Sequence, residues 1–270
     1  MVANEYSYSQ LYYRCIMKIP TIWIRKSHRY LGVIIGIQFI FWTVSGLFFA
    51  WNDIDAVHGD TLMAHQHSSF ILDTMNIIPI QTAIAALKSN VPQLSSIQSV
   101  QIREVLHKPM MELRYLIGKK EHFALVDAQN GTFRPSISAE EARKIAEDDF
   151  EPDSKVQGVE YITSVEPTSE YREKPLPAYR VTFDHESGSH IYVSAERGIV
   201  TSRRNNRWRA WDFLWAFHIL DFQTRDNIHN WLLRGMSALA VLTVISGFTL
   251  WGFTSPMLRK RRITKNNEPK

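Results

Sequence analysis

The sequence predicts a membrane protein of the α+β class, in which two transmembrane helices flank a large domain of helices and antiparallel strands. Three observations predict it: two long uncharged segments, basic residues beyond them, and strand-like alternation between them. The uncharged segments, residues 30–52 and 235–258, each exceed the roughly 20 apolar residues that a helix needs to cross a bilayer. The alternative is two buried core helices, which uncharged stretches of this length disfavour.

The average composition conceals this pattern. The 270 residues are 45% hydrophobic and 21% charged, which are ordinary values for a soluble protein and exclude a disordered or collagen-like chain. A single cysteine, Cys15, excludes a disulfide scaffold and a structural zinc site built on thiolates.

The charges sort by segment and predict the topology. Residues 1–29 carry five Lys/Arg and one Glu, net +4, and residues 259–270 carry six Lys/Arg and one Glu, net +5. The total is +4, so residues 30–258 sum to −5. Because basic flanks stay in the cytoplasm, both termini are expected there. A nucleic-acid patch is the competing interpretation of the tail, but the adjacent span explains it more simply, so no nucleic-acid partner is expected.

The first apolar segment is not expected to be a cleaved signal peptide, because it is longer than the apolar region of such a signal and lacks a small-residue cleavage pattern. The lipid bilayer is therefore a permanent partner. The expected order is a cytoplasmic arm at 1–29, a transmembrane helix at 30–52, an outer domain at 53–202, an interfacial amphipathic helix at 203–230, a second transmembrane helix at 231–258 and a basic cytoplasmic tail at 259–270.

The outer domain is predicted to hold two similar units, at about 78–133 and 136–202. Each begins with a helical segment and continues with strands that alternate apolar and polar residues. In the second unit Ser138 is the expected N-cap, and Glu141 completes a capping box. Both units end on a turn after a short strand, and Asn130–Gly131 in the first predicts a type I′ hairpin turn.

Short motifs in both units resemble the PepSY domain. Ser138-Ala139-Glu140-Glu141-Ala142 opens the second helix, and Val126–Gly131 and Tyr192–Gly198 carry the final turns. Ser194 departs from the Asp that usually starts this turn. The resemblance implies one helix and a three-stranded antiparallel sheet per unit, so the outer domain is expected to be a tandem of PepSY-like units.

The membrane segments resemble the PepSY-associated transmembrane family. Lys26–Gly32 is similar to the entry of its first span, and Phe217–Phe222, followed by Asn230–Trp231 and Ser246–Gly247, is similar to the approach to a later span. The resemblance implies the bacterial inner membrane, with the large loop in the periplasm. Larger relatives have four or more spans, and some resemble haem-bearing ferric-siderophore reductases.

Small residues predict the contact faces of the two spans, because helix association in hydrocarbon relies on close packing. Ser45–Gly46 and Ser246–Gly247 are the candidate contact points, and Gly32 with Gly36 forms a GxxxG motif. Since the spans run in opposite directions, the two Ser-Gly pairs lie at different depths. Each is expected to receive a large residue from its partner or from another subunit, which leaves a homodimer or larger membrane complex open.

An aromatic stripe before the second span predicts a helix lying on the outer leaflet. His218 lies on this stripe and needs a polar partner, for which a haem, Asp221 and Asn52–Asp53 are candidates. Nearby arginines suit headgroup phosphates. The stripe comprises Trp208, Trp211, Trp215, His218 and Phe222, and the arginines are Arg203, Arg204, Arg207 and Arg209.

The resemblance to haem-bearing relatives makes His28 a candidate haem ligand, and His218 and His229 are further candidates. The alternative for His28 is an interfacial residue that meets lipid phosphates beside Arg25 and Arg29, and haem binding there would need a second His28 from another subunit. If the helix continues, His218 and His229 share a face but lie about 16 Å apart along the axis, too far to bind one metal.

Three loop histidines, His58, His65 and His67, are weaker candidate metal ligands, since imidazole suits haem iron, zinc and copper alike. Solvated loop residues are the favoured alternative. No hydrolase motif of the G-x-S-x-G, HExxH or P-loop type is present. An acidic helix face is expected to be solvated, and it comprises Glu140, Glu141, Glu147, Asp148 and Asp149.

Two function classes remain. The first is a non-catalytic, membrane-anchored module whose outer domain binds a periplasmic peptide, peptidase or partner protein by strand addition. The second is a haem-binding electron-transfer subunit that serves ferric-siderophore or metal reduction. The first is the favoured general description, and hydrolysis is not expected.

Overall fold

A computed structural model describes residues 3–64 and 76–255, with side chains described from residue 22 onward. The chain divides into two units, one formed by both of its ends, up to Phe48 and from Leu214, and the other by Phe49–Phe213. The basic tail at 259–270 and the candidate ligands His65 and His67 lie outside the described residues.

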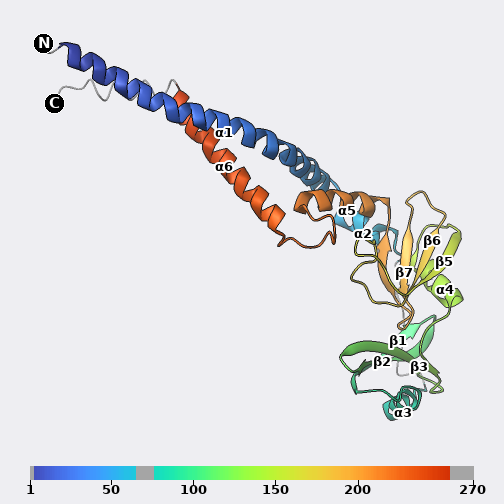
Figure 1. Cartoon of the computed structure of the whole chain (residues 1–270). Helices are drawn as coiled ribbons and strands as arrows, with labels where there is room; N and C mark the ends of the chain where they lie inside the picture. The colour runs from blue at the N-terminus through green and yellow to red at the C-terminus, as the bar shows by residue number, and fades with distance from the viewer. Residues whose placement is uncertain (1–2, 65–75, 256–270) are drawn as a thin grey trace. The chain divides into compact units, whose positions relative to one another are not determined.

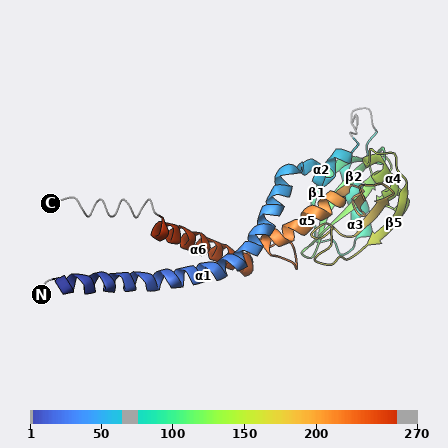
Figure 2. The ribbon, with the colours of Figure 1, turned by 90° about the horizontal axis from the view of Figure 1, so that it is seen from above.

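The first unit is helical. Its long helix α1 runs without interruption over Ala3–Trp51, so the expected arm and first span form one helix (Figures 1 and 2). Helix α6 covers Trp231–Thr254 and begins at Asn230, whose side chain accepts the Leu233 N–H. Two helical segments are long and apolar enough to cross a membrane, Ile22–Trp51 and Trp231–Thr254.

Both candidate spans expose their apolar side chains. No described residue of α6 is buried, and Val241 and Phe248 are 58% and 69% exposed. In α1 only Ile35, Gln38 and Ser45 are buried among the residues of its span. Such exposure differs from that of a core helix in a soluble protein, whose apolar face is covered.

Helix α5 (Asn206–Ile219) is shorter than the interfacial helix expected at 203–230. It ends because Leu220 takes a left-handed φ of 55° and the Asp221 N–H returns to the Ala216 carbonyl. The Asp221 carboxylate then accepts N–H groups of the following loop, including those of Gln223 and Thr224. The expected continuous helix is therefore wrong.

The second unit begins with two short helices, α2 (Ile54–His58) and η1 (Asp60–Leu62), and a first sheet follows. Helix α3 packs Ala83 and Leu87 against Met111, Leu113 and Val126 on one face of that sheet. The strand order is β1-β2-β3-β4, all antiparallel. The bounds are α3 Ile80–Asn90, β1 Ser96–Val105, β2 Lys108–Ile117, β3 Lys120–Asp127 and β4 Phe133–Arg134.

The second sheet repeats this order after helix α4, which lies against β5 (Figures 1 and 2). The capping box of α4 is confirmed, because Ser138 Oγ accepts the Glu141 N–H and the Glu141 carboxylate accepts the Ser138 N–H. Each sheet has four strands rather than the expected three. The bounds are α4 Ala139–Asp149, β5 Val156–Ile162, β6 Ala178–Phe183, β7 His190–Ser194 and β8 Val200–Arg204.

The core of the second sheet extends onto the first. Val181, Ile191 and Val193 pack with Ala142, Ala146 and Phe150 of α4, and Val105, Met110 and Leu125 of the first sheet belong to the same cluster. The two sheets therefore share one apolar cluster, separate from the cluster between the first sheet and α3.

The final turns of the two sheets have the same hydrogen bonds. In the first, Gly131 N–H donates to the Asp127 carbonyl and Asp127 N–H to the Thr132 carbonyl. In the second, Gly198 N–H donates to the Ser194 carbonyl and Ser194 N–H to the Ile199 carbonyl. One glycine in each turn is left-handed, with φ of 78° and 62°.

The predicted type I′ turn is wrong. That turn needs two consecutive left-handed residues, and Asn130 is not left-handed. Instead the Asp127 carboxylate accepts the N–H groups of Gln129 and Asn130, which closes a longer turn around Gly131.

Candidate functional site

His218, in the last turn of α5, contacts the first Ser-Gly pair. Its Nδ1 lies 2.6 Å from Ser45 Oγ, and its ring stacks on Trp215 at an interplanar angle of 3°. Ser45 is fully buried. The expected partner Asp221 instead binds N–H and hydroxyl groups of its own loop, and Ser45 is a partner that the sequence did not indicate.

His28 makes the matching contact with the second Ser-Gly pair. Its Nδ1 lies 2.7 Å from Ser246 Oγ, and its Cε1 would be 3.2 Å from a Cβ added to Gly247. At Gly32, Gly36 and Gly46 an added Cβ would meet nothing within 4 Å, so in the described part of the chain no other helix packs at these Cβ positions.

The hydrogen bonds of Ser45 and Ser246 indicate which ring nitrogen of each histidine carries the proton. Ser45 donates to the Phe41 carbonyl and Ser246 to the Thr243 carbonyl, each at 2.7 Å. Each hydroxyl has one proton, so it must accept from the histidine Nδ1–H. In the neutral ring the lone pair is then on Nε2, the arrangement in which a second group orients a metal-binding imidazole.

The candidate ligands do not converge within one chain. His28 and Ser45, which contacts His218, are 17 residues apart on one helix, or about 25 Å at 1.5 Å per residue. His229 lies in the exposed loop after α5, and His58 is exposed at the end of α2. No cluster of three metal-binding side chains occurs among the described residues.

The end of α5 is held by side chains of the spans. Gln38 Nε2 donates to the Phe217 carbonyl at 3.0 Å, Trp42 Nε1 to the His218 carbonyl at 2.7 Å, and Asn230 Nδ2 to the Ile219 carbonyl at 2.8 Å. These carbonyls have no partner inside their helix. The contacts therefore fix the backbone on both sides of the His218 ring. Gln38, a polar residue in an apolar span, was the sequence signal for this contact.

The arginines expected at lipid headgroups are instead bound within the protein. Arg203 pairs with Asp149 and with Asp60, and Arg209 pairs with Glu170 at 2.7 Å. Arg204 lies over the Trp208 ring. Arg207 is the one member of this group that is exposed. The pairing of Asp149 also corrects the expectation that the whole acidic face of α4 is solvated.

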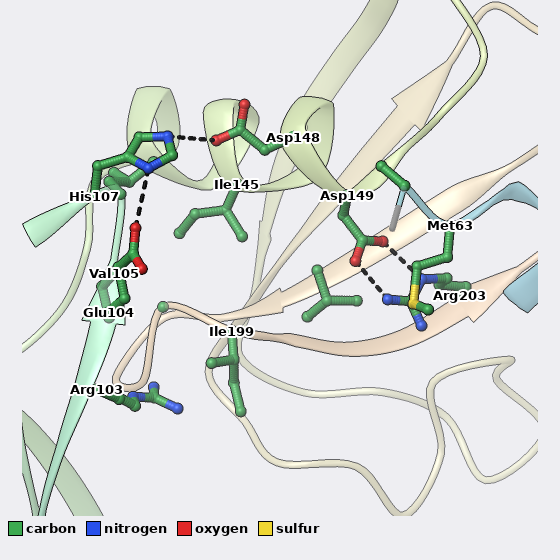
Figure 3. Close-up of a pocket in the computed structure, with 14 residues that line it drawn as sticks. Met63, Arg103, Glu104, Val105, His107, Ile145, Asp148, Asp149, Ile199 and Arg203 are labelled. Carbon is green, nitrogen blue, oxygen red and sulfur yellow. Dashed lines mark hydrogen bonds and ion pairs between the residues drawn. The ribbon is translucent and has the colours of Figure 1, made fainter. Parts of the chain in front are cut away.

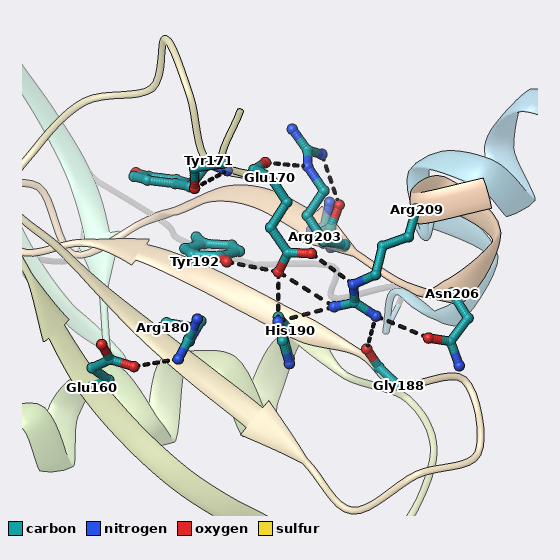
Figure 4. Close-up of polar contacts among 12 residues, drawn as sticks. Glu160, Glu170, Tyr171, Arg180, Gly188, His190, Tyr192, Arg203, Asn206 and Arg209 are labelled. Carbon is teal, nitrogen blue, oxygen red and sulfur yellow. Dashed lines mark hydrogen bonds and ion pairs between the residues drawn. The ribbon is translucent and has the colours of Figure 1, made fainter. Parts of the chain in front are cut away.

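Glu170 is the centre of a polar cluster that the sequence did not indicate. Its carboxylate accepts from Tyr192 at 2.8 Å and Arg209 at 2.7 Å, and lies 2.5 Å from His190 Nδ1 (Figure 4). Burial opposes ionisation, but these hydrogen bonds outweigh it and lower the pKa of Glu170 to about 2. Burial and the adjacent carboxylate raise the pKa of Tyr192. The cluster anchors the first half of α5 to β7.

The turn after β7 joins the two sheets. Its Arg197 donates to the buried Glu112 of β2 at 3.0 and 3.1 Å, and Arg103 of β1 pairs with the same carboxylate at 2.8 Å. Its Glu196 accepts the Phe123 N–H of β3 at 3.1 Å. Strand β4 pairs only with Leu125 and Val126 of β3. It does not reach Phe123 of the same strand, and Glu196 accepts the N–H there.

A groove of about 720 Å³ lies beside this junction (Figure 3). Its apolar lining includes Val105, Ile145 and Ile199, from β1, α4 and the turn before β8. At its rim His107 lies 3.0 Å from Glu104 and 4.0 Å from Asp148. Strands β1 and β8, which border the groove, are outermost in their sheets, and no other strand in the described part of the chain pairs with their outer edges.

Residues 136–204 match the model of the PepSY family, described as a peptidase propeptide and YPEB domain. The chain carries a PepSY domain. The match begins just before α4 and ends with β8, so the PepSY domain is the second sheet with its helix. The comparisons with curated proteins and with solved structures gave no match.

Proposed function

We propose that the chain is a two-pass inner-membrane protein whose periplasmic region is a tandem of PepSY-like units that binds an extended segment of a partner protein. The observation that carries the proposal is the groove between β1 and β8. Two outermost strands offer backbone N–H and C=O groups to an added strand, and the apolar lining offers pockets for its alternate side chains.

The tandem is supported by the matching turns and strand orders of the two sheets. The membrane-spanning role is supported by the exposed apolar faces of α1 and α6. The native Cys15, which is the single cysteine of the chain, provides a labelling site on the cytoplasmic side of the proposed topology. A membrane-impermeant maleimide should leave Cys15 unlabelled in intact spheroplasts, whereas the variant Cys15→Ser/Lys119→Cys should be labelled. Labelling of Cys15 in intact spheroplasts would contradict the topology.

Photo-crosslinking in intact cells tests the groove. A photoreactive amino acid at His107, whose side chain is 78% exposed at the groove rim, should give adducts with a partner polypeptide. The matched position is Tyr161, which is 52% exposed on β5, another outermost strand. The variant Ile199→Trp, which fills the groove, should abolish the His107 adducts. Equal adducts at both positions, or adducts that survive Ile199→Trp, would contradict binding in the groove.

A second candidate function, a haem-binding electron-transfer subunit for ferric-siderophore or metal reduction, is favoured by the tautomers of His28 and His218. Each ring has its Nδ1–H bound by serine and its lone pair on Nε2, as a haem ligand requires. A bound haem would supply one-electron transfer. The two rings are about 25 Å apart along the helix axis, so His28 and His218 of one chain cannot bind the same haem iron. A second copy of the chain would have to supply the second histidine ligand.

The visible absorption spectrum of protein purified after haem-replete expression separates the two functions. Electron transfer predicts a Soret band that is lost in His28→Ala or His218→Ala but retained in the control His229→Ala. A colourless wild-type preparation would exclude the haem function and leave the binding module.

A further inference from the structure

We propose that the paired inner ends of α1 and α6 bind one phospholipid with an anionic headgroup, an inference that rests on the membrane-spanning role proposed above. A cavity of about 510 Å³ lies there against His28 and one face of α6. Its α6 lining comprises Thr243, Val244, Gly247, Phe248 and Trp251.

The walls of this cavity suit an acyl chain. Phe248 and Trp251 are 69% and 60% exposed, and Val244 is 56% exposed, so the cavity opens to the surroundings of the helices. From Val244 to Trp251 the lining extends about 10 Å along α6, at 1.5 Å per residue. Gly247 lets the His28 ring lie against α6 as one wall of the cavity, since a Cβ there would be 3.2 Å from His28 Cε1.

Two arginines of α1 lie close in sequence to His28, the α1 residue that lines the cavity. Arg25 and Arg29 are three residues before and one after His28 on α1, so Arg25, His28 and Arg29 lie on one side of the helix. Both arginines are exposed, and no carboxylate in the described residues pairs with either. Two exposed guanidinium groups within one helical turn of His28, together with the apolar cavity that His28 lines, match a phosphate headgroup joined to a hydrocarbon chain.

The combination of an apolar cavity and nearby arginines favours an amphiphile over other occupants. A peptide helix would need only the apolar wall, and a free phosphate only the arginines, whereas a phospholipid uses both ends. In the proposed topology this end of the pair lies at the cytoplasmic leaflet, where juxtamembrane cations meet anionic lipids.

Native mass spectrometry of the full chain, extracted from membranes and titrated with phosphatidylglycerol or phosphatidylcholine, tests the inference. One phosphatidylglycerol should bind roughly 30-fold more tightly than phosphatidylcholine, at about fivefold for each arginine. Arg25→Gln/Arg29→Gln should remove this preference, and Gly247→Leu, whose side chain would displace the His28 ring that lines the cavity, should remove tight binding of both lipids. Excess inorganic phosphate should not displace the bound phosphatidylglycerol.

The matched controls lie on α6. Gly252→Leu adds the same side chain where no atom lies within 4 Å of the new Cβ, and Arg234→Gln removes an exposed arginine at the other end of the helix. Both should bind as wild type. Equal affinity for the two lipids, unchanged binding in Gly247→Leu, or displacement by phosphate would overturn the inference. Recovery of the wild-type chain in the soluble fraction would instead overturn the proposed membrane role, so the two failures are distinguishable.

Discussion

The final turns of the two sheets share a backbone conformation but contact different parts of the protein. Gly131 of the first turn faces α3 of the same PepSY-like unit, where an added Cβ would be 3.6 Å from Thr82. Gly198 of the second faces the other sheet, where an added Cβ would be 2.9 Å from Val105. The first turn therefore completes a local core, whereas the second joins the PepSY domain to the preceding sheet.

The side chains beside the two glycines explain the difference. In the first turn the Asp127 carboxylate accepts hydrogen bonds from N–H groups of the same turn. In the second, the corresponding position is the buried Ser194, and the charged residues Glu196 and Arg197 reach the first sheet instead. A repeated local structure can thus serve either packing within a unit or joining of units, according to the side chains it carries.

The largest expected effect is at Glu112. Glu112→Ala leaves Arg103 and Arg197 without their shared buried carboxylate, which we expect to cost about 3–5 kcal/mol. The measurement is hydrogen exchange of β2 and β7 amides in the full chain in detergent. The control is Glu121→Ala, which removes the exposed pair with Arg114 and should cost under about 0.5 kcal/mol. Similar costs for both would show that the junction does not depend on this ion pair.

The two turn glycines should respond unequally to alanine. Gly131→Ala should cost about 1–2 kcal/mol, the penalty of a left-handed φ, because its new Cβ makes ordinary contacts. Gly198→Ala adds a clash with Val105 and should cost roughly 1–3 kcal/mol more. Hydrogen exchange should show loosening of α3 and β3 in the first variant and of the shared core in the second. Equal effects would refute the distinction between the turns.

Acid should loosen the PepSY domain through Glu170. Its pKa is lowered to about 2 from an ordinary 4.5, because hydrogen bonds to its carboxylate outweigh burial. The stabilisation is therefore fully present above pH 4.5 and is lost as the pH falls toward 2. Exchange of β7 amides should rise over this interval, and Glu170→Gln should flatten that rise. An unchanged profile in Glu170→Gln would assign the acid response to other carboxylates.

The smallest expected effect is local to α4. Ser138→Ala removes one half of the capping box and should cost about 1 kcal/mol, seen as faster exchange in the first turn of α4. Ser89→Ala, in an exposed position near the end of α3, is the control and should change little. A large effect across both sheets would mean that the cap also supports the junction.

Much of the fold was predictable because it depends on local pattern. The strand at Ser96–Val105 follows from alternation, and the start of α4 follows from the Ser138–Glu141 capping box. The end of α5 was not predictable, because it depends on a left-handed Leu220, a conformation that a leucine does not signal.

The candidate site was predictable only in part. Ser45 and Ser246 were expected to be contact points, but the histidines that contact them are 173 and 218 positions away in the chain. No local pattern connects such distant residues. The same holds for Arg203 and Arg209, which were expected to bind lipid headgroups. In the structure they pair with Asp149 and Glu170, which are distant from them in the sequence.

The most direct test of the groove uses the partner segment that photo-crosslinking identifies, made as a synthetic peptide and added to the full chain in detergent. Hydrogen exchange is then compared with and without the peptide. Binding in the groove predicts slower exchange at the outer edges of β1 and β8 and no change in β5. Protection of β5 alone, or of no strand, would contradict the proposed function.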